Sequence, residues 1–469
     1  MKTLRRSGFR FALTVLAAAA TPACIVGPNY RPPNVDVPAT FRTLDNSTMA
    51  SYPSIAAESW SKAFTDETLQ GLIRTAMDQN TDVRLAALRI VEAQAQLGIT
   101  RADQFPEVSA GVNVLGERPA AALGFPSRNF FALVLQGSAS WELDFWGKYK
   151  RATEAARAQL VASEWGRRAV VTTLVSQVAN AYFGLRALDL ELDISRRTLE
   201  SRQESLRLTQ IRERGGATSL VDVRQAEQLV YGATTEIATL EREIAQQENF
   251  ISVLLGRNPG PVDRGVALVD EPRPADVPAG LPSTLLTERP DVQQSEQQLI
   301  AANAQIGIAR AAYFPTIPLT GSGGFESTAL AALFSGTNAI WTAGVGATAP
   351  IFTAGRTRAQ VELARARYDE AVLSYQQTIR QAFREVSDAL IGYAKLRESR
   401  TQQALLVTSA QDARRLADIR YRGGATSYLE VLDADTRLFD AQLGLAQAQL
   451  GELSGFVEIY RALGGGWQQ

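Results

Sequence analysis

Proline is absent from two long stretches of this chain, and its absence decides how far a helix can run. No proline occurs from Ser127 to Asn258 or from Ile351 to Gln469, whereas seven lie between Pro259 and Pro290. Proline removes a backbone donor and clashes with the preceding turn, so it ends or kinks a helix. The two proline-free stretches can therefore hold very long helices, and the proline-rich stretch between them predicts an extended linker.

The chain repeats itself on either side of that linker. Arg207–Ser219 (RLTQIRERGGATS) and Arg415–Ser427 (RLADIRYRGGATS) are identical at ten of thirteen positions. The pattern Gly98-Ile99 to Phe105-Pro106 recurs at Gly307-Ile308 to Phe314-Pro315. Matches in the same order indicate a tandem duplication. We predict repeat 1 over 61–256, a linker over 257–290 and repeat 2 over 291–465.

Each proline-free stretch carries a heptad pattern. Apolar or small residues recur with alternating spacings of four and three from Leu174 to Leu206, with Arg202 as a charged exception, and again from Tyr368 to Leu396. This spacing predicts coiled-coil packing. A helix from Lys148 to Arg214 would be about 100 Å long, which exceeds any globular core. Each repeat is therefore predicted to end in a long helical hairpin, turning at 215–219 or 423–427.

Segments of alternating polarity precede each hairpin. They predict strands over about 106–118, 130–145, 314–326 and 339–351, each long enough to cross a membrane when tilted. Their apolar faces include Trp141 and Trp341, and no amphipathic helix is left to cover them. The alternative is two hairpins packed on a soluble core. In lipid, four strands cannot close a barrel, whereas two chains would supply eight strands and three would supply twelve.

The composition argues against an enzyme. The chain of 469 residues has no histidine, one cysteine, and 48 basic against 49 acidic side chains. Most acid–base chemistry near neutral pH, the catalytic triads and the commonest metal ligand are therefore missing. One cysteine cannot form an internal disulfide, and the charge balance does not suit nucleic acid. We expect no catalysis, no cofactor and no metal site; carboxylate chemistry at Glu142 and Asp144 is the alternative.

The N-terminus has the features of an export signal. Residues 1–23 combine a basic leader, an apolar run from Phe11 to Ala20 and a small-residue end, and Cys24 follows. This pattern predicts a signal peptide cut just before Cys24, with a diacylglyceryl group and an N-acyl chain then attached to that cysteine. Thr21 stands where such sites usually have leucine, so ordinary cleavage that leaves a free thiol is the alternative. Residues 24–60 are expected to be extended.

These features together resemble the outer membrane efflux factor family of TolC-like channels. The resemblance is closest to its lipoprotein branch, represented by NodT and OprM in resistance–nodulation–division (RND) efflux systems. It is carried by the following motifs: Cys24-x-x-Gly27-Pro28-x-Tyr30-x-x-Pro33, the two Phe-Pro pairs, the two Arg-x-Arg-Gly-Gly-Ala-Thr-Ser turns, and Val431-Leu432-Asp433-Ala434.

The resemblance implies a mainly α-helical homotrimer with a membrane β part. Twelve strands would form a shared barrel, and the long helices an α-barrel that extends into the periplasm. The protein would be anchored by lipid in the cell outer membrane and would also span it. It would conduct drugs or other small solutes passively from a periplasmic adaptor (membrane fusion) protein and an inner-membrane pump, most naturally of the RND type.

The two Gly-Gly turns carry the candidate site. Their residues are Gly215, Gly216, Thr218 and Ser219 in repeat 1, and Gly423, Gly424, Thr426 and Ser427 in repeat 2. Glycine can end a helix in the left-handed conformation, and the serines are natural N-caps. Asp222 and Glu430 follow at capping-box spacing. The turns are either simple reversals or, in addition, docking tips for an adaptor.

By resemblance, Glu430 and Asp433 are candidates for an acidic ring in the pore, and Arg420 and Arg422 for an ionic latch. Asp222 is the equivalent gate candidate of repeat 1, which lacks a second acid at the position of Asp433. Some of these charges would instead be solvated helix faces. Two other functions remain as alternatives: an exit channel for type I protein secretion, and a lipid-anchored periplasmic coiled-coil tether, which would not need the strands.

Overall fold

The computed structural model describes residues 25–41, 54–118, 129–273 and 279–468. The predicted signal peptide over 1–23 and the lipidation site Cys24 lie outside the described residues. Within them, the elements in chain order are η1 (Ile55–Ala57), α2 (Trp60–Ala63), α3 (Glu67–Gln79), α4 (Thr81–Ala102), β1 (Glu107–Glu117), β2 (Phe130–Glu142), α5 (Lys148–Arg214), α6 (Leu220–Leu254), η3 (Pro282–Thr284), α7 (Leu285–Glu288), α8 (Pro290–Ala311), β3 (Pro318–Ser327), η4 (Leu330–Ala332), η5 (Gly336–Asn338), β4 (Ala339–Val345), α9 (Arg356–Arg422) and α10 (Tyr428–Ala462).

The chain folds into two compact units, and neither follows a repeat. Unit 1 comprises 1–34, 90–163 and 295–375, and unit 2 comprises 35–89, 164–294 and 376–469. Each unit therefore takes segments from both halves of the duplication. The long helices α5 and α9 begin in unit 1 and continue into unit 2.

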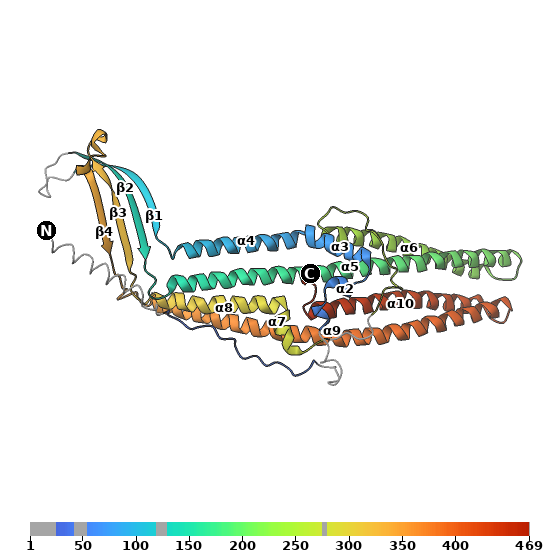
Figure 1. The fold of residues 1–469 in the computed structure, drawn as a ribbon. Helices are drawn as coiled ribbons and strands as arrows, with labels where there is room; N and C mark the ends of the chain where they lie inside the picture. The colour runs from blue at the N-terminus through green and yellow to red at the C-terminus, as the bar shows by residue number, and fades with distance from the viewer. Residues whose placement is uncertain (1–24, 42–53, 119–128, 274–278, 469) are drawn as a thin grey trace. The chain divides into compact units, whose positions relative to one another are not determined.

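Unit 1 is built around one antiparallel sheet in the order β1-β2-β3-β4 (Figure 1). Each repeat supplies one hairpin, and the pairing of β2 with β3, for example Ser138 opposite Ser322, joins the repeats. The predicted alternation is confirmed in the register: Ser109, Ser138, Ser322 and Thr342 form one continuous row across all four strands. Within the described residues, β1 and β4 each pair with one neighbour only and form the sheet edges.

The strands are shorter than predicted where their partners end. β4 stops at Val345 rather than Ile351, β2 stops at Glu142 rather than Phe145, and β3 begins only at Pro318. Pro318 offers a carbonyl, which accepts from Gly346 at 3.0 Å, but it has no N–H with which to continue the ladder. Beyond it a single bridge, Thr316 with Thr348, remains. The alternation of polar and apolar residues does not show where the neighbouring strand stops providing backbone N–H donors.

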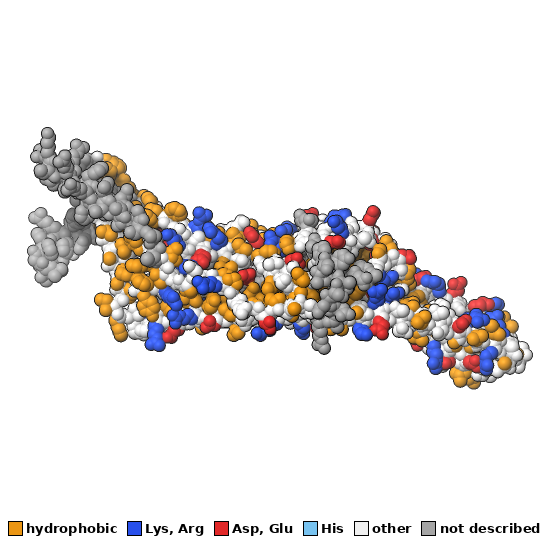
Figure 2. Space-filling model, turned by 60° about the horizontal axis from the view of Figure 1, so that its bottom comes forward, with side chains coloured by type: hydrophobic (Ala, Val, Ile, Leu, Met, Phe, Trp, Pro, Cys, Tyr) orange, Lys and Arg blue, Asp and Glu red, His pale blue; other side chains and the backbone are white. Residues whose placement is uncertain are grey.

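Within the described part of the chain, the apolar face of the sheet is left uncovered. Trp341 is 78% exposed, and Val108, Val112 and Val345 are also exposed. Figure 2 shows hydrophobic side chains gathered where the strands lie, whereas charges of both signs are scattered over the helices. The expectation that no helix covers these strands is therefore confirmed for the described residues.

Unit 2 is a helical bundle in which α6 lies beside α5 and α10 beside α9 (Figure 1). The predicted heptad positions Leu174, Val178, Ala181 and Leu185 are buried, as are their counterparts from Ala382 to Tyr393. The main core also includes α3 and the end of α2, where the ring of the C-cap residue Phe64 packs edge-on against Phe456 at 6.0 Å and Tyr460 at 5.7 Å. A second, smaller cluster near the hairpin turns contains Ala226, Ala417, Tyr428, Val431 and Ala434.

Among the described helices, none is both long enough and apolar enough to cross a membrane.

Candidate functional site

The turn of repeat 1 forms as predicted. Gly216 has φ of +72°, which glycine adopts without steric strain, and Ala217 N donates to Arg212 O at 2.8 Å to close the end of α5. Ser219 is the N-cap of α6, and it forms a capping box with Asp222. The carboxylate of Asp222 also accepts the Thr218 hydroxyl.

The hydrogen bonds at this turn control the charge of Asp222. Partial burial favours the neutral acid, but the bonds from Thr218 and Ser219 outweigh it and hold the pKa of Asp222 below its usual value. The carboxylate is thus ionised and engaged within its own turn. It serves the local reversal of the chain.

The turn of repeat 2 has the same backbone but different side-chain contacts. Gly424 again has φ of +72°, and Ser427 lies at the N-cap of α10. The Ser427 side chain makes no capping hydrogen bond, so the predicted cap is wrong in this detail. Thr426 instead donates to the Glu430 carboxylate, whose Oε1 lies 3.1 Å from Arg420 Nε. The longer side chain of Glu430 reaches across to α9, whereas the shorter Asp222 reaches only its own turn.

The remaining gate candidates are paired along their own helices. Asp433 Oδ2 lies 2.9 Å from Arg437 Nε, and Arg422 Nε lies 2.9 Å from Asp418 Oδ2. Glu430 and Asp433 line the same groove between α9 and α10, together with Arg437 and Asp440. The structure therefore brings the two predicted acids together on one surface, and it places Arg420, but not Arg422, in contact with one of them.

One charged pair near these turns was not predicted as a pair. Arg202 on α5 donates to Asp435 on α10 at 2.8 Å and to Leu229 O on α6 at 3.2 Å. Arg414 on α9 approaches the same carboxylate at 3.5 Å. The signal in the sequence was Arg202, a charged residue at a heptad seam position, because a charge buried in the seam requires a partner.

In the last turn of α5, Arg212 also stacks on an aromatic residue of the other hairpin. Its guanidinium lies 4.5 Å from the Tyr421 ring centroid, and the Tyr421 and Tyr428 rings are 5.3 Å apart. Arginine over an aromatic face is attractive and is strengthened by burial. Both hairpins of the duplication are thus joined close to their turns.

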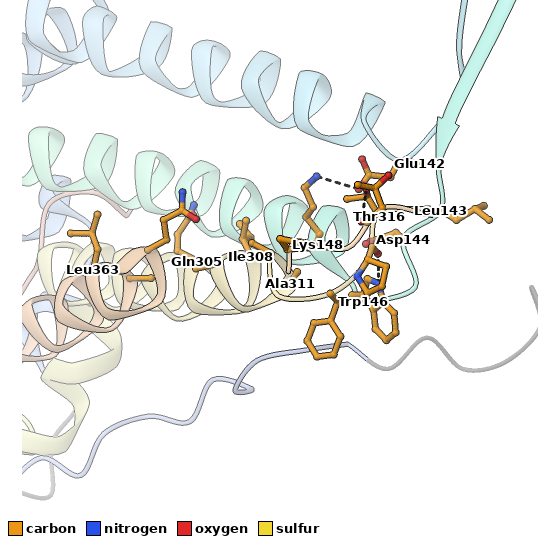
Figure 3. Close-up of a pocket in the computed structure, with 18 of the residues that line it drawn as sticks. Glu142, Leu143, Asp144, Trp146, Lys148, Gln305, Ile308, Ala311, Thr316 and Leu363 are labelled. Carbon is orange, nitrogen blue, oxygen red and sulfur yellow. Dashed lines mark hydrogen bonds and ion pairs between the residues drawn. The ribbon is translucent and has the colours of Figure 1, made fainter. Parts of the chain in front are cut away.

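Unit 1 contains a hollow of about 700 Å³ beside the ends of the strands. Figure 3 shows Gln305, Ile308 and Leu363 along it and Trp146, Thr316 and Lys148 at the strand end. Glu142 accepts from Tyr149 at 2.8 Å and pairs with Lys148 at 3.3 Å, while Asp144 accepts from the Lys150 amide at 2.9 Å. The two carboxylates considered for chemistry are therefore both engaged in local contacts.

Duplicated helical hairpins that share one antiparallel sheet define a class of outer-membrane channel proteins. The chain belongs to the outer membrane efflux protein family, whose model matches residues 72–257 and 281–465. The expected mainly helical fold with four strands is confirmed.

Curated relatives match almost the whole chain. The probable efflux pump outer membrane protein TtgC of Pseudomonas putida is 38% identical over 455 residues, covering 95% of this chain and 93% of the relative. The cation efflux system protein CusC of Escherichia coli is 34% identical, with 97% and 99% covered. The probable outer membrane lipoprotein SilC of Salmonella typhimurium is 34% identical, with 94% and 95% covered.

Solved structures of outer-membrane channels have the same fold as this chain. The outer-membrane channel OprN superimposes with a TM-score of 0.87 at 30% identity, covering 95% of this chain and all of that one. The open state of the MtrE outer membrane channel of Neisseria gonorrhoeae gives 0.85 at 30% identity, covering 95% and 99%.

Proposed function

We propose that three copies of this chain form the outer-membrane exit duct of a tripartite efflux system. The observation that carries the proposal is the four-stranded sheet of unit 1, whose edges β1 and β4 are unpaired and whose apolar face is bare in the described chain. Lipid cannot satisfy open backbone edges, so the sheet has to be completed by other copies. The likeness to solved channels supports twelve strands from three chains over the narrower barrel of two.

The opposite face of the sheet suits a water-filled interior. Ser109 Oγ and Ser138 Oγ are 2.8 Å apart, and Ser322 Oγ and Thr342 Oγ1 are 2.6 Å apart, all in one row. Such a row of hydroxyls hydrogen-bonds water, whereas Trp341 and Val108 on the other face suit lipid. The long helices would then continue the duct into the periplasm, and a passive duct requires no catalytic group.

The gate would lie at the hairpin turns of repeat 2. Glu430 and Asp433 share one groove, and a threefold arrangement would place their carboxylates around the pore, where they would attract cations and repel anions. The Arg420–Glu430 pair at 3.1 Å supports an ionic latch that holds the tip closed. Asp222 is less suited, because its carboxylate is engaged as a cap.

The hairpin turns and the N-terminal segment indicate the partners. The turns expose Leu220, Val221 and Leu429, which supports docking of a periplasmic adaptor that connects to an inner-membrane pump of the RND type. At the N-terminus, Cys24 would carry the lipid, as the description of SilC as a lipoprotein suggests. Just after it, Arg151 donates to Asn29 at 2.8 Å and Asn303 to Pro28 O at 3.0 Å, which fixes the segment on α5 and α8.

Planar-bilayer recording of the purified full-length protein tests the duct. We expect discrete conductance steps, an oligomer that dissociates only on heating in gels, and acyl chains on the mature N-terminus by mass spectrometry. A folded protein that remains monomeric and never conducts would contradict the proposal. Conductance with an unmodified Cys24 would refute only the lipid anchor.

A further inference from the structure

Buried acidic groups hold the first part of the proline-rich linker against unit 2. These groups have no role in the proposed duct. Asp66, the N-cap of α3, is 3% exposed, and Glu271 of the linker is 5% exposed. Tyr182 of α5 lies against Asp66 and is fully buried. Buried carboxyls are rare unless they are paired or neutral, so this cluster requires a physical account.

Asp66 is the member that keeps its charge. Its Oδ1 accepts from the Thr68 amide at 2.7 Å and the Leu69 amide at 3.3 Å, and its Oδ2 accepts from Tyr182 Oη at 2.7 Å and the Val266 amide at 3.0 Å. Burial would raise the pKa of Asp66, but these four donors outweigh it and hold the pKa below its usual value.

The linker approaches this carboxylate so closely that only glycine fits. A Cβ on Gly265 would lie 2.3 Å from Asp66 Oδ1. The Gly265 amide donates to Tyr182 Oη at 2.8 Å, and the next amide, that of Val266, donates to Asp66 itself. The linker is therefore held here by two consecutive backbone donors.

Glu271 lacks comparable donors among the described residues. Its Oε1 is buried without a hydrogen-bond partner, and its carboxyl lies within hydrogen-bonding reach of Asp66. Burial first, and then the negative charge of Asp66, raise the pKa of Glu271 to about 7. When the two adjoining carboxyls share one proton, Glu271 is the one that carries it, since four donors already stabilise the negative charge of Asp66.

The cations around the pair are occupied elsewhere. Arg186 of α5 pairs with Asp189 at 2.7 Å and donates to Val266 O at 3.0 Å. Arg273 of the linker donates to Leu268 O at 2.6 Å and lies 3.5 Å from Glu452 of α10. Other charged groups nearby are also paired: Arg264 of the linker with Glu248 of α6 and with Asp189, and Arg400 of α9 with the same Glu452.

We propose that Asp66 and Glu271 form a one-proton binding site that fastens the linker to α3 and α5. With the proton bound, Glu271 donates to the Asp66 carboxylate and the pair carries a single negative charge. When the proton leaves to water, two carboxylates face each other in a buried space, and the contact of the linker with the bundle weakens.

The sign of the pH effect follows from linkage. Glutamate has a pKa of 4.5 when free and about 7 in this site, so the folded contact binds the proton more tightly than the opened one. The stabilisation is complete below pH 4.5 and is lost as the pH rises toward 7. From these two values, the equilibrium constant for opening rises about tenfold between pH 6 and pH 8.

Hydrogen–deuterium exchange of the full-length protein in detergent micelles tests this site. Exchange of the segment 262–273, corrected for the intrinsic effect of pH, should show about tenfold less protection at pH 8 than at pH 6. The ratio of protection at pH 6 to protection at pH 8 is therefore about ten in the wild type. Glu271→Gln keeps a donor toward Asp66 but cannot ionise, so its protection should be equal at the two pH values. Glu248→Gln alters a carboxylate that contacts the same linker through Arg264 and should retain the wild-type ratio.

Two results would overturn the proposal. One is a wild-type segment whose corrected protection does not change between the two pH values, and the other is a Glu271→Gln protein with the wild-type ratio. If Glu271→Gln fails to fold, Asp66→Asn decides the question. Asparagine is also a good N-cap and removes the charge that raises the pKa of Glu271, so the ratio should shrink, and an unchanged ratio would count against the site.

Discussion

Arg202 Nε lies 2.8 Å from Asp435 Oδ2, and this contact joins the first hairpin of the duplication to the second. The side chains of the two residues are 6% and 13% exposed. A buried charge that loses its partner is left without water or a counter-charge, which destabilises more than the intact pair stabilises.

Arg202→Ala should therefore lower the free energy of unfolding by about 3–5 kcal/mol, the usual range for breaking a buried pair. Asp412→Ala is the matched control, since its pair with Arg415 at 3.1 Å is on the exposed surface of α9. Chemical denaturation followed by circular dichroism would measure both. If the two variants lose equal stability, Arg202 does not have the role that we assign to it.

Gly215 and Gly216 of the first turn should respond differently to substitution by alanine. Gly216 has φ of +72° with open space around a would-be Cβ, so Gly216→Ala should cost about 1–2 kcal/mol through backbone strain alone. Gly215 lacks a positive φ, and its Cβ would make ordinary contacts, so Gly215→Ala should be close to neutral. Amide exchange at the start of α6 measures the difference, and equal exchange in the two variants would contradict it.

The two faces of the sheet should respond oppositely to charge. Trp341→Arg places arginine on the apolar face, where it costs about 2–4 kcal/mol near the middle of a bilayer. Thr342→Arg places the same charge on the hydroxyl row and should be tolerated. The yield of heat-modifiable oligomer after folding into vesicles compares them. Equal yields would mean that the faces are wrongly assigned.

The helical part of the fold could be predicted because its signals are local and long. The heptad positions from Leu174 to Leu185 are buried as expected, and the turns at Gly216 and Gly424 fall inside the predicted segments. The strand ends could not be predicted with the same accuracy. β4 stops at Val345 because its partner begins at Pro318, and such a limit depends on a residue far away in the chain.

The site was predictable in position but not in pairing. The sequence places Arg420 and Glu430 on either side of a turn, and the structure shows the contact at 3.1 Å. The sequence alone could not show that the Ser427 side chain makes no capping hydrogen bond and that Thr426 reaches Glu430 instead. The proton site was missed altogether, since Asp66 and Glu271 are distant in sequence and belong to no motif.

Acid should weaken unit 2 through a different cluster. Arg289 is buried and lies 2.6 Å from Asp291 and 2.9 Å from Glu385. Burial raises the pKa of Asp291, but the hydrogen bonds and charge of Arg289 outweigh it, and the pKa stays below its usual 3.8. Stability from this carboxylate is therefore present above pH 3.8 and lost as the pH falls further.

Asp291→Asn should lower the melting temperature at neutral pH and flatten its decline in acid. Thermal unfolding followed by circular dichroism between about pH 2 and pH 7 would show both effects. Asp388→Asn is the control, because its contact with Arg384 is solvent-exposed and long, at 4.0 Å. An Asp291→Asn protein that melts like the wild type at every pH would show that the cluster contributes nothing.

The gate makes the most direct prediction about transport. Glu430→Ala combined with Asp433→Ala removes both acids from the groove between α9 and α10, and it frees Arg420 and Arg437 from their partners. In single-channel recordings, the ratio of cation to anion permeability should fall severalfold, because the pore would lose its fixed negative charge. The open probability should rise, since the Arg420–Glu430 contact would no longer hold the turn against α9. Asp412→Ala removes an exposed carboxylate that lies outside this groove and should leave both quantities as they are. If selectivity and open probability both stay unchanged in the double variant, Glu430 and Asp433 do not form the gate.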